Sequence, residues 1–235
     1  MHTNNQEPGA TSNSDRMRHT IPARKLPITL DGNWNKPAWQ DVPALQLDNF
    51  MGERPEHFPV TRARLCYDSE AVYLIFHVQD RYVRAVTEQE FHGNVCQDSC
   101  VEFFFTPGAP AQPGYFNLEI NCGGVMLLHW QTIPRKPTKI DPADCRQVEI
   151  FHQLPRMIDP EIDRPTDWTI ECRLPLAVLQ KYAPIAKPAP GVEWHGNFYK
   201  CASRTSHPHL LTWSPINSSR RDFHRPDYFG HLLFV

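Results

Sequence analysis

The chain has 235 residues, 40% of them hydrophobic, and its 24 Lys and Arg residues nearly balance 26 Asp and Glu residues. A net charge of −2 offers no broad basic surface to neutralise phosphates, so nucleic acid is not an expected partner. No apolar run approaches the roughly 20 residues of a membrane-spanning helix, and the N-terminal segment contains no apolar stretch typical of a signal peptide. We therefore expect no membrane span and a cytoplasmic location.

The opening of the chain predicts a tail followed by one domain. Residues 1–25 are polar and are expected to be a disordered tail, whereas residues 26–235 are long enough for one sizeable core. Trp34 and Trp39 flank a proline in a predicted helical turn, where they are expected to plug the core beneath a loop.

The central stretch, residues 97–130, alternates with the period of a β-strand. Val101, Phe103 and Phe105 fall on one fully apolar face. Glu102 falls on the opposite face, and Glu119 lies on the polar side of the hairpin that follows. These strands are expected to form the centre of the fold.

The whole chain is predicted to form about ten short strands and one short helix. Besides the central stretch, strands are expected at residues 26–30, 61–67, 71–79, 148–152, 168–174, 194–202, 210–213 and 229–235, and the helix at 175–179. Short strands with many turns indicate an all-β fold, a two-sheet antiparallel β-sandwich of the jelly-roll or immunoglobulin-like kind.

The chain contains none of the common catalytic or nucleotide-binding motifs, and its seven cysteines show no zinc-binding spacing. Cys66, Cys100, Cys172 and Cys201 lie in strand patterns and are expected to be buried as small hydrophobes. Two carboxylates on neighbouring strands leave one enzymatic alternative open, a glycoside hydrolase that uses Glu102 and Glu119.

A series of sequence blocks resembles the family 9 carbohydrate-binding modules and their DOMON-like relatives. The blocks are DGNWNKPAW, YLIFHVQD, QDSCVEFFF, YFNLEIN, DWTIECRLPL and the closing PDYFG, and they cover residues 26–235. The resemblance implies a β-sandwich that holds the end of a sugar chain between aromatic rings, often with structural calcium and beside enzymes of carbohydrate catabolism. It also implies that such modules act outside the cytoplasm.

The family's site residues transfer only in part. Two tryptophans of the xylanase-linked members fall at Val95 and Phe223 in this chain, and a basic residue of those members falls at Glu119. The acidic residue of the VEFF block is retained as Glu102. The second acidic position of the opening DGxxD pattern is Asn35, which argues against a calcium ion there.

A sugar presents apolar C–H faces and a rim of hydroxyls, so its site needs flat rings together with hydrogen-bonding groups. Aromatic and cationic residues near the C-terminus supply such groups, and Trp194 and His224 are among them. The predicted ligand-binding residues are Trp130, Trp213, Phe223, Glu102, Glu119, Asn197, Tyr199, Lys200 and Arg225. No metal ligand is assigned.

A haem-binding electron-transfer domain is a second alternative. DOMON-like relatives ligate haem through Met and His, and Met51, Met126 and His129 are the corresponding candidates here. None of them lies in a haem-specific motif.

Overall fold

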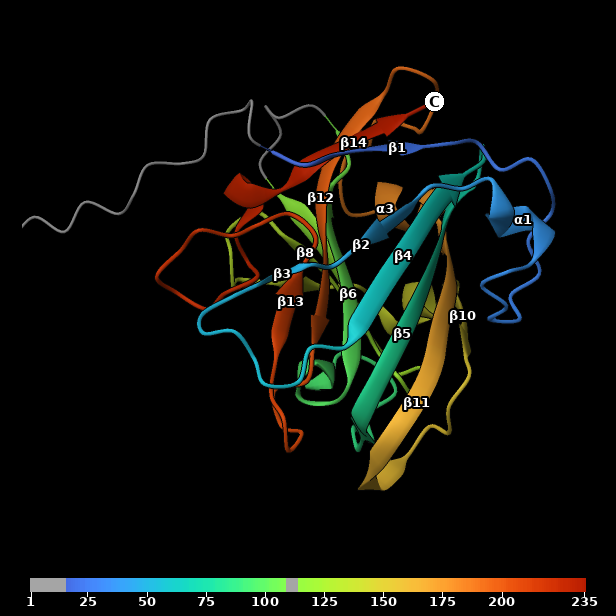
Figure 1. The fold of residues 1–235 in the computed structure, drawn as a ribbon. Coiled ribbons are helices and arrows are strands. Elements are labelled where there is room, and N and C mark those ends of the chain that lie inside the picture. The colour runs from blue at the N-terminus through green and yellow to red at the C-terminus, as the bar shows by residue number, and fades with distance from the viewer. Residues whose placement is uncertain (1–15, 109–113) are drawn as a thin grey trace, which may run out of the picture.

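The computed structural model describes residues 16–108 and 114–235, and two β-sheets packed face to face make up most of it (Figure 1). The larger sheet runs in the order β1 (Arg18–Ile21), β14 (Gly230–Phe234), β12 (Glu193–Cys201), β6 (Cys100–Thr106), β7 (Tyr115–Asn121), β8 (Met126–Gln131) and β9 (Thr138–Lys139). In addition, β13 (Leu210–Thr212) pairs with β12 and with β3 (Asn49–Phe50). The smaller sheet runs in the order β10 (Glu149–His152), β11 (Ile158–Pro175), β5 (Ala71–Ala85), β4 (Val60–Tyr67) and β2 (Ala44–Gln46).

Short helices lie in the connections between strands. The α-helices are α1 (Pro37–Gln40), α2 (Pro142–Cys145) and α3 (Leu176–Gln180), and 3₁₀ turns span Val95–Gln97 and Pro226–Tyr228. Proline occupies the first position of α1 and α2, where its missing N–H costs no hydrogen bond. The β-sandwich and the helix near residue 175 are confirmed, but the described residues contain three α-helices where one was predicted.

The alternation in β6 sets which side of the larger sheet becomes the core. Val101, Phe103 and Phe105 pack between the two sheets, and the ring of Phe103 stacks on that of Phe198 with centroids 4.6 Å apart. The predicted inward face is confirmed. Fully burying one such aromatic side chain contributes about 1.5–3 kcal/mol, so this face determines the register of the sheet.

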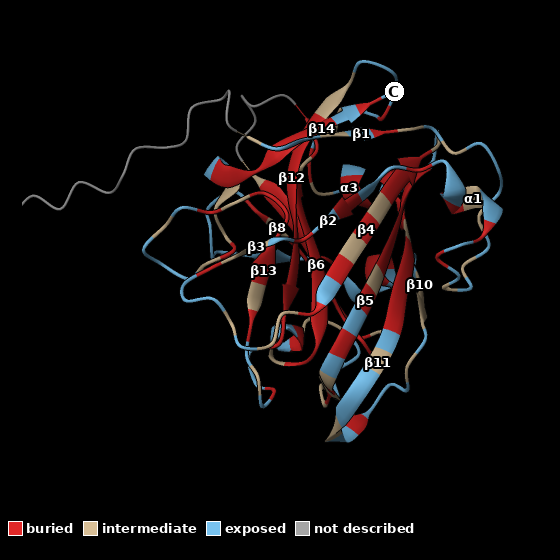
Figure 2. Ribbon diagram, in the orientation of Figure 1, coloured by how far each residue is buried: buried red, intermediate tan, exposed pale blue. Residues whose placement is uncertain are grey.

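The outer face of the smaller sheet is covered by the chain that precedes β2. Trp34 and Trp39 pack there against Tyr73 and Ile75, as predicted. The Trp39 indole N–H also donates a hydrogen bond of 2.8 Å to the buried carboxylate of Glu171. This second layer keeps the smaller sheet buried on both faces near its centre, whereas the first half of β11 is largely exposed and the far end of β5 alternates between buried and exposed residues (Figure 2).

The outer face of the larger sheet is only partly covered. The loop between β13 and β14 lies across it and forms an outer cluster in which Ile216, Phe223 and Phe229 pack on Phe104 and Tyr199. The functional site lies beside this cluster.

The N-terminal boundary differs from the prediction. Residues 18–21, expected within a disordered tail, form β1, which pairs in parallel with β14. Pairing with the last strand satisfies the backbone hydrogen-bonding groups of β1, and this partner could not be assigned from the sequence alone. It adds one parallel strand pair to the antiparallel pairs of the other named strands. Residues 22–25 of the predicted tail are also ordered, since Ala23 bridges to Tyr67 and Arg24 Nε pairs with Asp68 Oδ2 at 2.6 Å. The strand predicted at residues 26–30 does not form. Residues 1–15 of the predicted tail lie outside the described residues. Within the described ranges no helix is long and apolar enough to cross a bilayer.

Candidate functional site

A pocket of about 320 Å³ opens on the outer face of the larger sheet. Its lining residues come from β6, β7, β12 and β13, from the 3₁₀ turn before β6, and from the segments that follow β8, β12 and β13: Cys96, Glu102, Phe104, Glu119, Arg135, Cys201, Ser203, Leu210, Arg221, Asp222, Phe223 and His224. The residues contributed by β6, β7 and β12 are buried, whereas Arg135, Ser203 and Arg221 are exposed. The pocket therefore has a rigid floor and an exposed rim.

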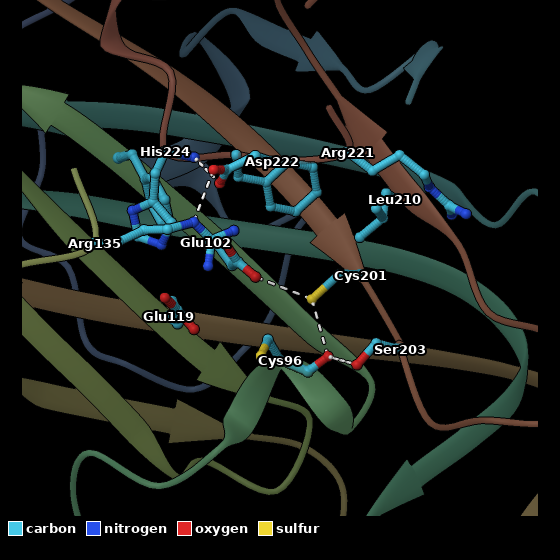
Figure 3. Close-up of a pocket in the computed structure, with 12 residues that line it drawn as sticks. Cys96, Glu102, Glu119, Arg135, Cys201, Ser203, Leu210, Arg221, Asp222 and His224 are labelled. Atoms are coloured by element: carbon cyan, nitrogen blue, oxygen red, sulfur yellow. Dashed lines mark hydrogen bonds and ion pairs between the residues drawn. The ribbon is translucent and has the colours of Figure 1, made fainter. Parts of the chain in front are cut away.

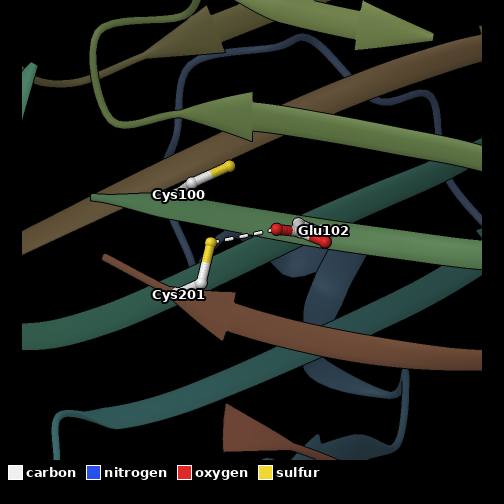
Figure 4. A group of neighbouring side chains, drawn as sticks. All are labelled: Cys100, Glu102 and Cys201. Atoms are coloured by element: carbon white, nitrogen blue, oxygen red, sulfur yellow. Dashed lines mark hydrogen bonds between the residues drawn. The ribbon is translucent and has the colours of Figure 1, made fainter. Parts of the chain in front are cut away.

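Two carboxylic acids form the floor. Glu102 on β6 and Glu119 on β7 stand directly opposite each other in the strand register, and they are only 2% and 6% exposed. The Cys201 thiol donates a hydrogen bond of 2.9 Å to Glu102 Oε1 (Figure 4), and Asn117 Nδ2 donates one of 3.0 Å to Glu119 Oε1. Gln131 in turn donates to Asn117 Oδ1 at 2.7 Å, which fixes the amide that orients Glu119.

Burial favours the protonated forms of Glu102 and Glu119. Loss of hydration raises the pKa of Glu119 to about 7. It also raises the pKa of Glu102 well above its ordinary value, and the neighbouring Cys201 and Glu119 add to this shift. Near neutral pH the pair therefore retains at least one proton and presents both donors and acceptors to a ligand.

An aromatic wall rises beside the two carboxyls. The Phe223 ring stacks on the buried Tyr199 ring with centroids 4.1 Å apart, and the Tyr199 hydroxyl donates to the Phe223 carbonyl at 3.2 Å. Phe104 meets the Tyr199 ring edge-on at 5.0 Å. The ring of Phe223 is thus held by its neighbours in a fixed orientation where it lines the pocket.

The remaining side of the pocket carries charge. Arg135 Nε pairs with Asp222 Oδ2 at 2.8 Å, and the His224 backbone N–H donates to the same carboxylate at 2.9 Å. Although burial opposes it, these two hydrogen bonds lower the pKa of Asp222. Burial lowers the pKa of His224 to about 4, so its imidazole is neutral near pH 7. Figure 3 shows Arg135, Asp222 and His224 on one side of the pocket and Cys96 and Ser203 on the opposite side.

Such a pocket offers what a polyhydroxylated ring requires, and comparison with known proteins identifies the family. The model of carbohydrate-binding family 9 matches residues 25–234, which include every strand of the two sheets except β1 and all the residues of the pocket. The chain belongs to carbohydrate-binding family 9.

Solved structures share the fold of this family 9 chain. One is a candidate carbohydrate-binding protein from Bacteroides uniformis, with 25% identity and a TM-score of 0.80 over 93% of this chain and 99% of that one. Another is a family 9 module from Caldicellulosiruptor kristjanssonii in complex with cellotriose, with 14% identity and a TM-score of 0.63 over 93% of each chain. The same module in complex with glucose gives the same identity and TM-score over 93% of this chain and 96% of that one.

A further relative is a curated protein that is similar to this chain in sequence. It is described as an extracellular protein of Arthroderma benhamiae and is 23% identical over 183 residues, which cover 76% of this chain and 80% of that protein.

The pocket of this family 9 chain brings together three of the nine predicted ligand-binding residues. Glu102, Glu119 and Phe223 line it. Tyr199 lies directly behind Phe223 and supports it. The prediction located these four because strand alternation and the position of the aromatic ring could both be read from the sequence.

Two of the other predicted residues fix the structure around the pocket and do not line it. Asn197 connects β12 to the segment after β13, since its Nδ2 donates to the Ser214 carbonyl at 2.9 Å and its Oδ1 accepts from the Ser214 N–H at 2.8 Å. Arg225 pairs with Asp227 at 2.8 Å, and its guanidinium lies over the Tyr228 ring.

The last three predicted residues project toward the sandwich interior. Trp213 is 2% exposed and belongs to the core between the sheets, and Trp130 packs at the edge of that core against Phe116. Lys200 points inward from β12 and pairs with Asp80 at 3.3 Å, with both side chains fully buried. For Trp130 and Lys200 the alternation of the strand directs the side chain away from the pocket, whereas Trp213 lies one residue beyond β13.

Most of the rim was missed by the sequence analysis. Arg135 and Arg221 lie in irregular segments whose place above the sheet no periodicity reveals. Asp222 and His224 adjoin Phe223 in the chain, so the sequence could have indicated them. His224 was named among the aromatic and cationic residues near the C-terminus but not among the predicted ligand-binding residues. Cys201 is buried as predicted, but its thiol also contacts Glu102, and this pairing follows only from the register of β12 on β6.

The residues near Asp31 do not fit the structural calcium that the family resemblance raises. Oxygens of the Thr29 carbonyl, Asp31 and Glu171 converge as hard-cation ligands would, but Lys36 Nζ lies at their centre. It is 2.9 Å from Asp31 Oδ1 and 2.6 Å from Glu171 Oε1. The ammonium group supplies the positive charge that these oxygens require.

The haem candidates do not converge. Met126 packs in the core between the sheets, whereas Met51 belongs to the outer cluster. His129 lies three residues from Met126 on β8 and therefore projects from the opposite face of the sheet. These three side chains do not form a pair of axial ligands.

Proposed function

We propose that the protein is a non-catalytic carbohydrate-binding module whose pocket grips the end of a sugar chain. Membership of carbohydrate-binding family 9 supports the class of ligand, and so do the relatives solved with cellotriose and glucose. The observation that carries the proposal is the placement of two opposed, buried carboxyls beside the fixed ring of Phe223 in one pocket.

The chemistry of the pocket matches a pyranose. The ring of Phe223 offers an apolar surface to the C–H face of the sugar, and Glu102 and Glu119 offer hydrogen bonds to its hydroxyls. About 320 Å³ lies at the small end of the range for ligand pockets, which favours one or two terminal sugar units over the middle of a long chain.

This pocket depends more on hydrogen bonds than a sandwich of two tryptophans would. Val95, at one of the two tryptophan positions, is fully buried in the outer cluster and does not line the pocket. Phe223, at the other, is the smaller ring. The two carboxyls and the rim charges compensate for the lost aromatic surface.

Calorimetric titration with glucose, cellotriose and xylotriose tests the proposal. Phe223→Ala is expected to weaken binding about tenfold, which corresponds to about 1.4 kcal/mol, because the stacking surface is lost. Glu102→Gln should weaken it by a similar factor by changing the donors and acceptors on the floor. Trp130→Phe, outside the pocket, is the matched control and should leave affinity unchanged.

Three results would contradict the proposal. The first is no heat from any of these sugars at millimolar concentration. The second is loss of binding in Trp130→Phe with full binding in Phe223→Ala. The third is turnover of an aryl glycoside that disappears in Glu102→Gln, since it would make the two carboxyls catalytic. The placement in the DOMON-like superfamily and a role beside glycoside hydrolases stay predictions from the sequence.

A further inference from the structure

A second cluster of chemically reactive side chains lies on the same face of the larger sheet, away from the sugar pocket. His195 on β12 and His231 on β14 stand directly opposite each other in the strand register, and Glu193 lies two residues before His195 on the same face. Cys201 lies six positions after His195 along β12, which corresponds to about 20 Å of strand. The two sites are therefore independent of each other.

The three side chains converge closely. Glu193 Oε1 is 2.9 Å from His231 Nδ1 and 3.3 Å from His195 Nε2, and the two imidazole centroids are 4.8 Å apart. Each residue offers one possible ligand atom, and these three atoms all lie within 4.8 Å of one another. Two imidazole nitrogens and one carboxylate oxygen are a donor set suited to a borderline first-row ion.

The environment of His231 points to a missing ligand. His231 is only 5% exposed, and its Nε2 has no hydrogen-bond partner among the described residues. A buried ring nitrogen without a partner is costly, and because Nδ1 is the atom that faces Glu193, a water molecule beside the ion would remove that cost at Nε2. Glu193 and His231 also line a cavity of about 330 Å³, and the Glu193 side chain is 35% exposed, so an ion can enter from solvent.

We propose that Glu193, His195 and His231 bind a divalent transition-metal ion, of which Zn²⁺ is the prototype, with water completing its coordination. Two flanking cations compete with the ion, since the exposed Arg18 lines the cavity and Arg16 lies close enough to act electrostatically on His195. A bound ion would join β12 to β14, the strand on which β1 rests.

Titration of the full chain, free of any affinity tag, with Zn²⁺ and with Co²⁺ tests this site. The expected result is one equivalent of metal and a Co²⁺ absorption spectrum typical of four or five ligands. His195→Ala and His231→Ala should each weaken binding at least roughly tenfold, and the milder Glu193→Gln should also weaken it. Circular dichroism of each variant shows whether it is folded, and Glu193→Gln keeps the test decisive if a histidine variant is not.

Matched controls separate this site from other metal-binding groups. The variant His92→Ala with His129→Ala removes two stacked imidazoles, one in the connection between β5 and β6 and one on β8, and should retain full binding. Absence of binding in the wild type would overturn the proposal. So would undiminished binding in the variant His195→Ala with His231→Ala, and loss of that binding in Cys201→Ser would then assign the metal to Cys100, Glu102 and Cys201.

Discussion

Glu119→Gln should change how the stability of the protein depends on pH. The folded state raises the pKa of this carboxyl from 4.5 to about 7, so between these values the folded state holds a proton that the unfolded state has released. The contribution of Glu119 to the free energy of unfolding therefore falls as the pH rises through this window and is constant above about pH 7. A pKa difference of this size corresponds to about 3 kcal/mol. The glutamine variant, which cannot ionise, should lose this part of the slope.

Urea denaturation at pH 5, 6, 7 and 8 measures the effect. The free energy of unfolding of the wild type relative to that of Glu119→Gln should fall across the series, because buried histidines such as His224 affect both proteins alike and cancel in the difference. Glu53→Gln, which changes an exposed glutamate, should follow the wild type at every pH. Parallel curves for the wild type and Glu119→Gln would refute the assignment of a buried, proton-retaining carboxyl at the pocket floor.

Two further predictions concern buried charges outside the pocket. Lys200→Met leaves Asp80 without its buried cation and should cost about 3–5 kcal/mol of unfolding free energy in a urea titration, while any sugar affinity of the folded protein is retained. Lys36→Met leaves Glu171 buried without its ammonium partner and should destabilise by a similar amount. Lys25→Ala breaks an exposed ion pair and serves as the control, with no measurable loss expected. A neutral effect of either buried substitution would show that the interior solvates the remaining carboxylate.

The sandwich itself could be predicted because alternation is a local property of the chain. Phe103 and Phe105 reveal the inner face of β6 without reference to any other strand. Features that depend on partners far along the chain could not be predicted in the same way. β5 extends to Ala85, six residues beyond the predicted end at residue 79, because residues 80–85 pair with β11. Nothing in their composition indicates that pairing.

The same contrast between local pattern and distant pairing explains which residues of the candidate site could be predicted. Glu102 and Glu119 were found because strand residues of known parity must share a face. Lys200 was misplaced because it was chosen for its chemistry, although its parity on β12 is opposite to that of Tyr199. The charged rim, Arg135 and Arg221, comes from irregular segments, where a side chain's position depends on tertiary packing that leaves no periodic signal.

The two carboxylic acids of the pocket, Glu102 and Glu119, lie on hydrogen-bonded strands, whereas the ring of Phe223 lies in the irregular connection between β13 and β14. Strand residues cannot change without disturbing their paired neighbours, whereas the connection between residues 213 and 230 can vary so long as Phe229 and Tyr228 stay anchored. Evolution, or an engineer, could therefore retarget this module to another glycan by exchanging that connection alone, and the acid pair would be inherited unchanged.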